Sequence, residues 1–184
     1  DISEAISMSD RVAVLTRRDM PGALPQLVQA ARAAASVIRD RFSPDAWRAL
    51  VDLEACVLAP AGAAPAEAEA LERADSALRI IAAFSGLVSE NMNRLTGWRF
   101  LELGRRTERA INTLRCARVF SERGTPGALD TLLQVADSQI TYRSRYMMVE
   151  ARGPVLDLVL LDPENPRSVA FQISHIATHL GMIP

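Results

Sequence analysis

Aromatic residues, cysteines and long apolar runs are all scarce in this chain of 184 residues. Aromatic side chains make up 5% of it, and no segment alternates polar and apolar residues for long enough to predict a sheet. Its two cysteines, Cys56 and Cys116, lack the spacing of metal ligands, which favours buried thiols in a reducing compartment, the cytoplasm. No apolar run approaches the ~20 residues that span a bilayer, and the start lacks a signal peptide, so we expect no membrane segment.

Neither sign of charge is in excess, since 21 lysines and arginines face 22 aspartates and glutamates. A net charge of −1 gives no general attraction to phosphate backbones, so nucleic acid is not an expected partner. Hydrophobic residues make up 49% of the sequence, which is enough to bury a core over this length. Alanine, leucine, arginine and glutamate dominate, and this composition predicts an all-α fold.

Proline, glycine and capping residues divide the chain into helical segments. The expected helices occupy residues 3–17, 21–41, 43–57, 66–94, 98–122, 128–150 and 166–181. The apolar run from Val155 to Leu161 would suit a buried strand, but a short helix is favoured because there is no second strand to pair with. The sequence therefore predicts a single domain over residues 1–184, an antiparallel bundle of seven or eight helices with a flexible linker near 59–65.

Two of these helices carry apolar stripes that predict their buried faces. In the helix over 66–94 the stripe is Leu71, Ala74, Leu78, Ile81, Val88 and Met92. In the helix over 98–122 the stripe is Phe100, Leu103, Ala110, Leu114 and Ala117. We expect both stripes to face the core of the bundle.

Two stretches far apart in the sequence resemble each other, Leu15–Ala23 and Leu160–Ser168. Each begins with leucine, has an acidic residue two places before a proline, and has a small residue two places after it. Two long helical segments precede the second copy, whereas few residues precede the first. This pattern predicts an internal duplication whose first unit lacks its first helix. The empty helix site would leave an apolar groove near residues 3–40, unless a partner or a second copy in a homo-oligomer covers it.

Polar side chains gather on three predicted helices at positions that their neighbours mark as buried, and together they form a candidate polar pocket. Its members are Glu90, Asn93, Arg94, Arg105, Glu108, Arg109, Tyr142, Arg145 and Tyr146. Glu108 lies on the helix row of Leu101 and Ile111, so its carboxylate is expected to point inward. Arg105 can pair with Glu108, while Arg105 and Arg109 repel each other one turn apart unless an anion separates them.

Three interpretations of this cluster stay open. Ionised groups inside a bundle cost several kcal/mol unless they are paired, so the cluster is a structural ion-pair lattice, an anion-binding pocket or a catalytic site. Catalysis would use Glu90 and Glu108 as an acid–base pair. A binding pocket would prefer phosphate, sulfate or an acidic peptide, because the arginine fork matches carboxylate and phosphate oxygens.

No metal or cofactor site is indicated. His175 and His179 lie one turn apart on one helix face and could hold a metal, but no third ligand is identifiable. Neither cysteine has a histidine nearby in the sequence, and there is no glycine-rich phosphate loop of either common form. We therefore expect neither a metal nor a cofactor.

Several stretches of the chain resemble the bacterial alpha-E family, all-helical proteins named for a Glu-Arg motif. The stretches that carry the resemblance are Ser89–Met92, Gly97–Ala110, Tyr142–Tyr146, Pro154–Leu158 and Asn165–Gln172. The resemblance covers essentially the whole chain and is specific from Ser85 onward. A family member normally carries an earlier Glu-Arg helix near its beginning, and the lack of that helix here agrees with the expected truncation.

The resemblance implies an association with a circularly permuted ATP-grasp domain, fused or separate, and with transglutaminase-like and proteasome-like hydrolases. ATP-grasp enzymes join a carboxylate to an amine through an acyl phosphate. The expected function is therefore a helical module that binds the ligase and an anionic peptide or small-molecule substrate, in bacterial peptide synthesis or modification. The alternatives are an enzyme with acid–base chemistry of its own and a purely structural scaffold.

Overall fold

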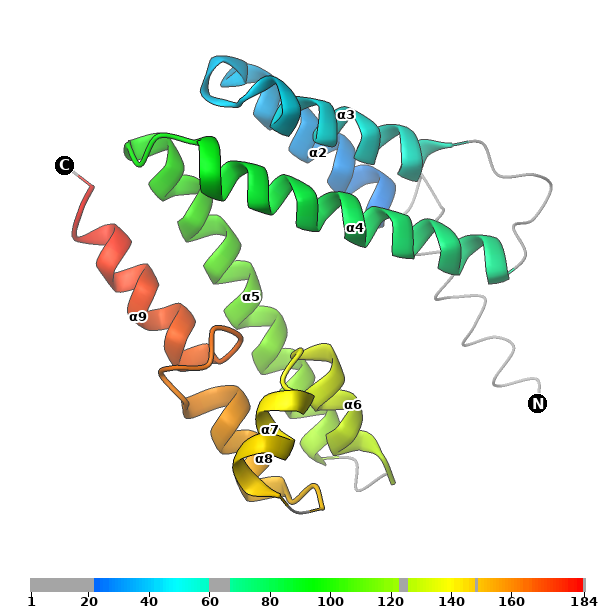
Figure 1. Ribbon diagram of the computed structural model, residues 1–184, viewed down its shortest axis with the longest axis vertical. Coiled ribbons are helices and arrows are strands. Elements are labelled where there is room, and N and C mark those ends of the chain that lie inside the picture. Colours follow the sequence, from blue (N-terminus) through cyan, green and yellow to red (C-terminus); the bar gives the residue numbers. More distant parts are fainter. Residues whose placement is uncertain (1–21, 60–66, 123–125, 148, 184) are drawn as a thin grey trace. The chain divides into compact units, whose positions relative to one another are not determined.

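The computed structural model describes most of the chain (Figure 1). The described residues are 22–59, 67–122, 126–147 and 149–183. They form eight α-helices and no strand, which confirms the all-α fold class. The expected helix over 3–17 and residues 60–65 of the expected linker lie outside the described residues. So does most of the first copy of the sequence repeat, and the internal duplication therefore stays a prediction.

The chain divides into two compact units, unit 1 over residues 1–93 and unit 2 over residues 94–184. The boundary falls between the two longest helices. None of the described helices is both long and apolar enough to cross a bilayer.

The described residues of unit 1 form three α-helices and one short 3-10 helix. Its elements are α2 (Leu24–Val37), η1 (Arg39–Arg41), α3 (Pro44–Leu58) and α4 (Glu67–Asn91). α3 begins where the sequence predicts, because Ser43 Oγ accepts a hydrogen bond from the Ala46 N–H at 3.2 Å and Pro44 occupies the first turn. α3 packs against both α2 and α4, and its Leu53 and Val57 form the centre of the core.

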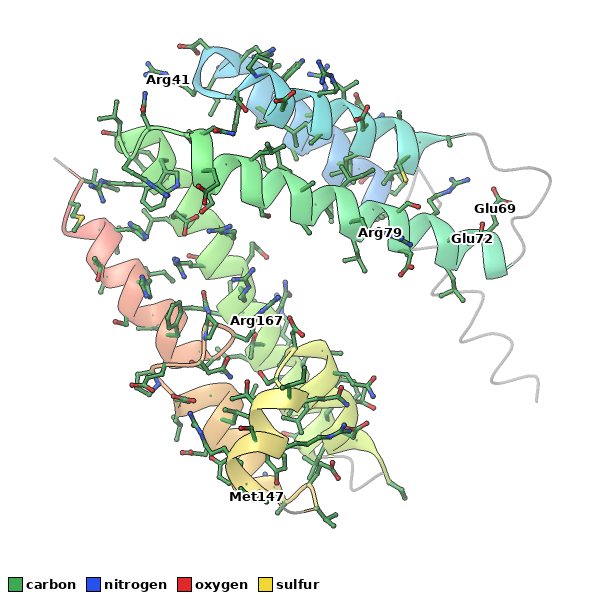
Figure 2. All side chains as sticks on the ribbon, viewed as in Figure 1. Arg41, Glu69, Glu72, Arg79, Met147 and Arg167 are labelled. Atoms are coloured by element: carbon green, nitrogen blue, oxygen red, sulfur yellow. The ribbon has the colours of Figure 1, made fainter. Side chains whose placement is uncertain are left out.

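The apolar stripe predicted for α4 is only partly buried. Val88 and Met92 are buried as expected, but Leu71 and Leu78 are 61% and 65% exposed. Ala77, which the stripe does not include, also lies in the core that α2 and α3 share. The prediction failed because it assigned the largest apolar residues to the core, whereas a close helix contact favours alanine. Charged side chains lie on the exposed surface of α4, among them Glu69, Glu72 and Arg79 (Figure 2).

Unit 2 consists of one long helix with shorter helices packed along it (Figure 1). Its elements are α5 (Thr96–Glu122), α6 (Ala128–Val135), α7 (Gln139–Tyr146), α8 (Arg152–Leu156), the π-helical η2 (Asp157–Leu161) and α9 (Val169–Leu180). α5 packs against α6, η2 and α9. The core includes Leu132 and Leu133 of α6, Tyr142 of α7 and Leu158 of η2, all at most 1% exposed.

Two expectations for the second half of unit 2 have different outcomes. The run from Val155 to Leu161 is helical, as favoured, with the last part of α8 leading directly into η2. The single helix expected over 128–150 is instead two helices, α6 and α7. They are separated at Asp137, whose φ of 49° places it in the left-handed region that ends helices.

α5 buries a different face from the one that its apolar stripe predicts. Ala110 and Ala117 are buried as expected, but Phe100 and Leu114 are 58% and 49% exposed. The buried carboxylate is Glu102, at 1% exposure. Glu108 is exposed, so the prediction that it points inward is wrong. The two glutamates are six positions apart, and at 3.6 residues per turn they point to different faces of the helix.

Candidate functional site

The charged centre of unit 2 is the carboxylate of Glu102 on α5. It forms an ion pair with the guanidinium of Arg105, and Arg106 Nη2 lies 2.9 Å from its Oε2 atom. The side chain of Glu102 is 2% exposed and that of Arg106 is 13% exposed, so water screens this pair little. Arg105 therefore pairs with Glu102 and not, as the sequence suggested, with Glu108.

Arg106 connects the Glu102 ion pair to α9. Its Nη1 donates a hydrogen bond to Gln172 Oε1 at 3.3 Å. Gln172 is fully buried, and its Nε2 donates to the Pro166 carbonyl at 2.7 Å and to the Ser168 carbonyl at 3.2 Å. Burial lowers the pKa of Arg106, and the Glu102 carboxylate partly offsets this effect. The ion pair thus joins α5 to α9 and to the loop before α9.

The loop over residues 162–168, which belongs to the second copy of the sequence repeat, is held by buried hydrogen bonds. Asn165 Nδ2 donates to Ser138 Oγ at 3.1 Å and to the Leu158 carbonyl at 3.0 Å. Ser168 Oγ donates to the Asp162 carbonyl and caps α9 by accepting a backbone N–H of its first turn. The polar side chains of the repeat therefore fix the direction in which α9 begins.

The three candidate residues of α7 also form hydrogen bonds within the fold, and one of them, Arg145, holds this loop. Arg145 Nη1 donates to Asp162 Oδ2 at 2.7 Å, and the Tyr146 hydroxyl donates to Asp157 Oδ2 at 3.2 Å. Tyr142 is fully buried, and its hydroxyl accepts a backbone N–H that follows α7. Burial acts to raise the pKa of Asp162, but hydrogen bonds from a backbone N–H and from Arg145 lower it below its usual value. These residues hold the fold together and leave few polar groups free for a ligand.

The remaining candidates on α4 and at the start of unit 2 are exposed. Glu90 and Asn93 are exposed residues of unit 1, whereas the other candidates belong to unit 2. Arg94 is exposed as well, and its guanidinium lies 4.3 Å from the centre of the Trp98 ring. Such a cation–π contact suits a packing role for Trp98.

A buried histidine on α9 packs beside Trp98. His179 is 6% exposed, and its ring meets that of Trp98 edge-on at a centroid distance of 5.1 Å. Burial and then the nearby Arg106 charge lower the pKa of His179 below its usual value, and the same causes lower that of His175. Among the described residues no three side chains of the metal-binding types come together.

A cavity of about 320 Å³ lies between α5 and α6 and contains two of the predicted arginines. α5 contributes Arg105, Arg109, Asn112, Thr113 and Cys116, and α6 contributes Leu132, Val135 and the adjoining Ala136. The lining residues of α5 recur every three or four positions, so they form one face of the helix. Of the residues on this face, the sequence analysis identified only Arg105 and Arg109 as candidate site residues.

The cavity carries more positive than negative charge. Arg109 belongs to none of the ion pairs of the described residues, whereas the neighbouring Arg167 pairs with Asp137 at 2.8 Å. Burial and then the guanidinium groups of Arg167, Arg105 and Arg106 lower the pKa of Arg109. Since Arg105 and Arg106 share one carboxylate, four guanidinium groups have two carboxylates between them. Arginine stays charged despite such surroundings, so the cavity keeps its excess of positive charge at neutral pH.

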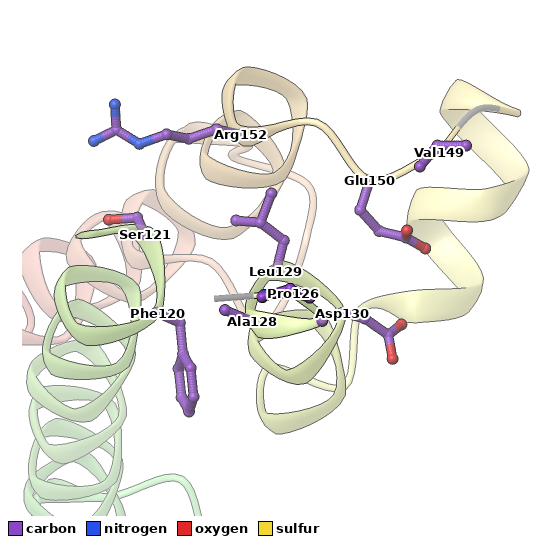
Figure 3. A pocket seen from close by; sticks show the side chains of 10 residues that line it. Phe120, Ser121, Pro126, Ala128, Leu129, Asp130, Val149, Glu150 and Arg152 are labelled. Carbon is purple, nitrogen blue, oxygen red and sulfur yellow. The ribbon is translucent and has the colours of Figure 1, made fainter. Parts of the chain in front are cut away.

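A second cavity, of about 410 Å³, is lined by two carboxylates and one guanidinium group, that of Arg152 (Figure 3). Phe120 and Leu129 form apolar parts of its wall, and Asp130 and Glu150 contribute carboxylates that lie on the same side of Leu129 in this view. The Asp130 carboxylate already accepts hydrogen bonds from two glutamine side chains. An anion is therefore expected at the cavity between α5 and α6 and not at this one.

The fold and the site define a helical domain in which closely spaced arginines on one helix share a buried glutamate. The chain belongs to the Alpha-E family, described as a predicted α-helical domain with a conserved ER motif, whose model matches residues 4–184.

The chain is also similar to the uncharacterized proteins Rv2567 of Mycobacterium tuberculosis and Mb2597 of Mycobacterium bovis, each 29% identical over 175 residues. These matches cover 90% of this chain and 20% of each relative, so the chain spans about a fifth of their length. No solved structure matches the chain significantly.

Proposed function

We propose that this domain is a helical binding module that holds an anionic group of a partner or substrate for an ATP-grasp-type amide or peptide ligase. The observation that carries the proposal is the excess positive charge of the cavity between α5 and α6. Arg109 lies there beside three other guanidinium groups and takes part in no described ion pair. A bound carboxylate or phosphate would separate these charges and accept the planar guanidinium forks.

The arginines of α5 have different roles in this proposal. Arg106 is committed to Glu102 and Gln172 and therefore positions α9 against α5. Arg105 also pairs with Glu102, but it lines the cavity and its side chain is 34% exposed, so it can contact both the glutamate and a ligand. Arg109 is the main ligand-binding residue because it lines the cavity and forms no ion pair with any other described residue.

Acid–base catalysis by Glu90 and Glu108 has less support. Both side chains are exposed, and neither lines either of the two cavities described above. Among the described residues of unit 2 the deeply buried glutamate is Glu102, and each of its carboxylate oxygens is already paired with a guanidinium group, Oε1 with Arg105 and Oε2 with Arg106. The cavity between α5 and α6 contains no carboxylate or histidine that could accept a proton.

An ATP-grasp ligase is a suitable partner because its substrates and its acyl phosphate intermediate are anions. The mycobacterial relatives are about five times as long as the segment that matches this chain, which leaves room in them for a fused ligase domain. Cys56 and Cys116 are free thiols, which supports the cytoplasm as the compartment. Amide or peptide bond formation from ATP would then take place on the ligase, with the helical module holding the anionic group.

A thermal-shift experiment tests the anion site. Phosphate, sulfate and acetate are added to the chain at constant ionic strength, and binding at ten times Kd should stabilise it by about 1.4 kcal/mol. Arg109→Gln should abolish the effect. Arg118→Gln is the matched control, since Arg118 is exposed on the same helix and lies outside the cavity. Equal shifts in all three proteins would show a general salt effect and would refute the proposed site.

A separate experiment tests the partner. A purified circularly permuted ATP-grasp domain is titrated calorimetrically with the chain in the presence of ATP. We expect binding that Arg109→Gln weakens and Arg118→Gln does not. A lack of binding would remove the ligase from the proposal and leave the anion site to the thermal-shift result.

A further inference from the structure

The cavity between α5 and α6 is polar on one side only. The α5 side presents the guanidinium groups of Arg105 and Arg109 together with the side chains of Asn112 and Thr113. On the α6 side the lining residues are Leu132, Val135 and Ala136, which have no side-chain hydrogen-bond donor. A ligand oxygen that faced α6 would lose its water without gaining a hydrogen bond, which is unfavourable.

This asymmetry separates the possible anions by shape. Phosphate and sulfate carry oxygens in all directions, so at least one of them would face the apolar side. A carboxylate has both oxygens at one end and carbon at the other, and an aliphatic group on that carbon would fill the space beside Leu132 and Val135. The lining therefore favours an anion whose opposite end is apolar.

We propose that the cavity binds a carboxylate that carries a small aliphatic group. This inference rests on the proposed anion-binding function and adds the class of ligand. The carboxylate lies between Arg105 and Arg109, and the aliphatic group contacts Leu132 and Val135. Asn112 and Thr113 offer an amide and a hydroxyl to any polar group beside the carboxylate.

The volume of the cavity limits the size of the ligand. About 320 Å³ is near the lower end of ligand pockets, which suits a small group such as one amino acid. A free aliphatic amino acid and the last residue of a peptide both have this chemistry, with a carboxylate close to a branched alkyl group. The two sources differ in whether the nitrogen is a charged amine or a neutral peptide N–H.

Titration of the chain by NMR with a homologous series of acids tests the inference. The probes are acetate, propionate, isobutyrate, isovalerate, isovaleramide and inorganic phosphate, all at constant ionic strength. Each added methylene that reaches the α6 side should tighten binding by about fourfold. Isovaleramide should bind at least about tenfold more weakly than isovalerate, because it lacks the charge. The amide signals of Thr113 and Val135 should shift with isovalerate.

Two variants distinguish the charged side of the cavity from the apolar side. Val135 is 58% exposed, so Val135→Asn should preserve the fold. This variant should bind isovalerate only about as tightly as acetate, and its affinity for acetate should not change. Arg109→Gln should weaken both acids. Val37→Asn is the control, because Val37 is 82% exposed on α2 in unit 1.

The outcomes distinguish the proposed ligand class from the proposed anion-binding function. If acetate, isovalerate and phosphate bind equally well at Arg109, the aliphatic selectivity is wrong and the anion-binding function stands. If none of them binds, both are wrong. If isovalerate binds best and Val135→Asn removes the preference, the ligand class is established. Valine compared with the dipeptide Ala-Val then assigns the source, since the tighter ligand identifies a free amino acid or a peptide end.

Discussion

Replacing Glu102 by alanine should destabilise unit 2 more than any other single charge removal on α5. The substitution leaves two guanidinium groups without their shared carboxylate, and the two are not equally able to reach water. The side chain of Arg105 is 34% exposed and can turn outward, whereas that of Arg106 is 13% exposed and is also held by Gln172. Arg106 therefore accounts for most of the expected cost.

The magnitude follows from the general cost of breaking a buried ion pair. Removing one partner costs about 3–5 kcal/mol, because the other charge stays buried and uncompensated. Since Arg105 can be solvated, we expect the lower end, about 3 kcal/mol. With a urea m value of about 2 kcal/mol per molar, the midpoint of unfolding should fall by about 1.5 M. The double variant Glu102→Ala with Arg106→Leu should recover part of this loss, because it removes the stranded charge.

Glu108→Ala is the matched control for this measurement. It makes the same substitution on the same helix at an exposed position, so the free energy of unfolding should change by no more than about 0.5 kcal/mol. Circular dichroism melts of the three variants in urea give the comparison. Equal midpoints for Glu102→Ala and Glu108→Ala would refute the assignment of Glu102 as the buried carboxylate of the ion-pair cluster.

Three further outcomes are expected. Asn165→Ala removes the donor to the buried Leu158 carbonyl and one of the two hydrogen bonds of the buried Ser138 hydroxyl, so the free energy of unfolding in urea should fall by about 2 kcal/mol; a loss below about 0.5 kcal/mol would contradict the loop structure. The pKa of His179 lies below its usual value of 6.5, so the stability that depends on its neutral form is complete above that pH and is lost as the pH falls through the folded value. Melting temperatures from about pH 7 to pH 5 should therefore decline, and His179→Gln should flatten the decline unless another group causes it. Iodoacetate should alkylate Cys116 faster, relative to neutral iodoacetamide, than it alkylates the other cysteine; a ratio that Arg109→Gln leaves unchanged would contradict an anion-attracting cavity.

The helices of this chain were predictable because local chemistry determines where they begin and end. Ser43 and Pro44 start α3 as the sequence predicts, whereas α9 begins at Val169 behind the Ser168 cap and not at residue 166 as expected. The faces of the long helices were not predictable in the same way. Helix packing depends on how closely two backbones approach, and in α4 this favours Ala77 over the larger Leu78.

The polar residues show the same limit. Arg105 and Arg109 were identified because arginines one turn apart repel each other, and that argument needs only the helix geometry. Glu102 and Gln172 were missed because their burial depends on the approach of α9, which comes from a distant part of the sequence. Glu108 was chosen in place of Glu102 because its apolar neighbours Leu101 and Ile111 suggested that its face of the helix is buried. The face that α9 covers is instead the one that carries Glu102.

The balance of charge distinguishes the structural part of the arginine cluster from the part available to a ligand. Glu102 and Arg106 neutralise each other, and Arg106 also bonds Gln172. This group can specify the fold without a further partner. Arg109 adds little to that group, because burial and the neighbouring guanidinium groups lower its pKa, and the carboxylate that acts in the opposite direction, Glu102, is already paired with Arg105 and Arg106. The presence of such an unneutralised arginine is explained if it binds an anionic group of a ligand or partner protein. Arg109→Gln should therefore leave the ligand-free chain as stable as before, or slightly more stable, while it abolishes anion binding. Urea melts without added anion would show the reverse, a clear loss of stability, if Arg109 belonged to the structural lattice.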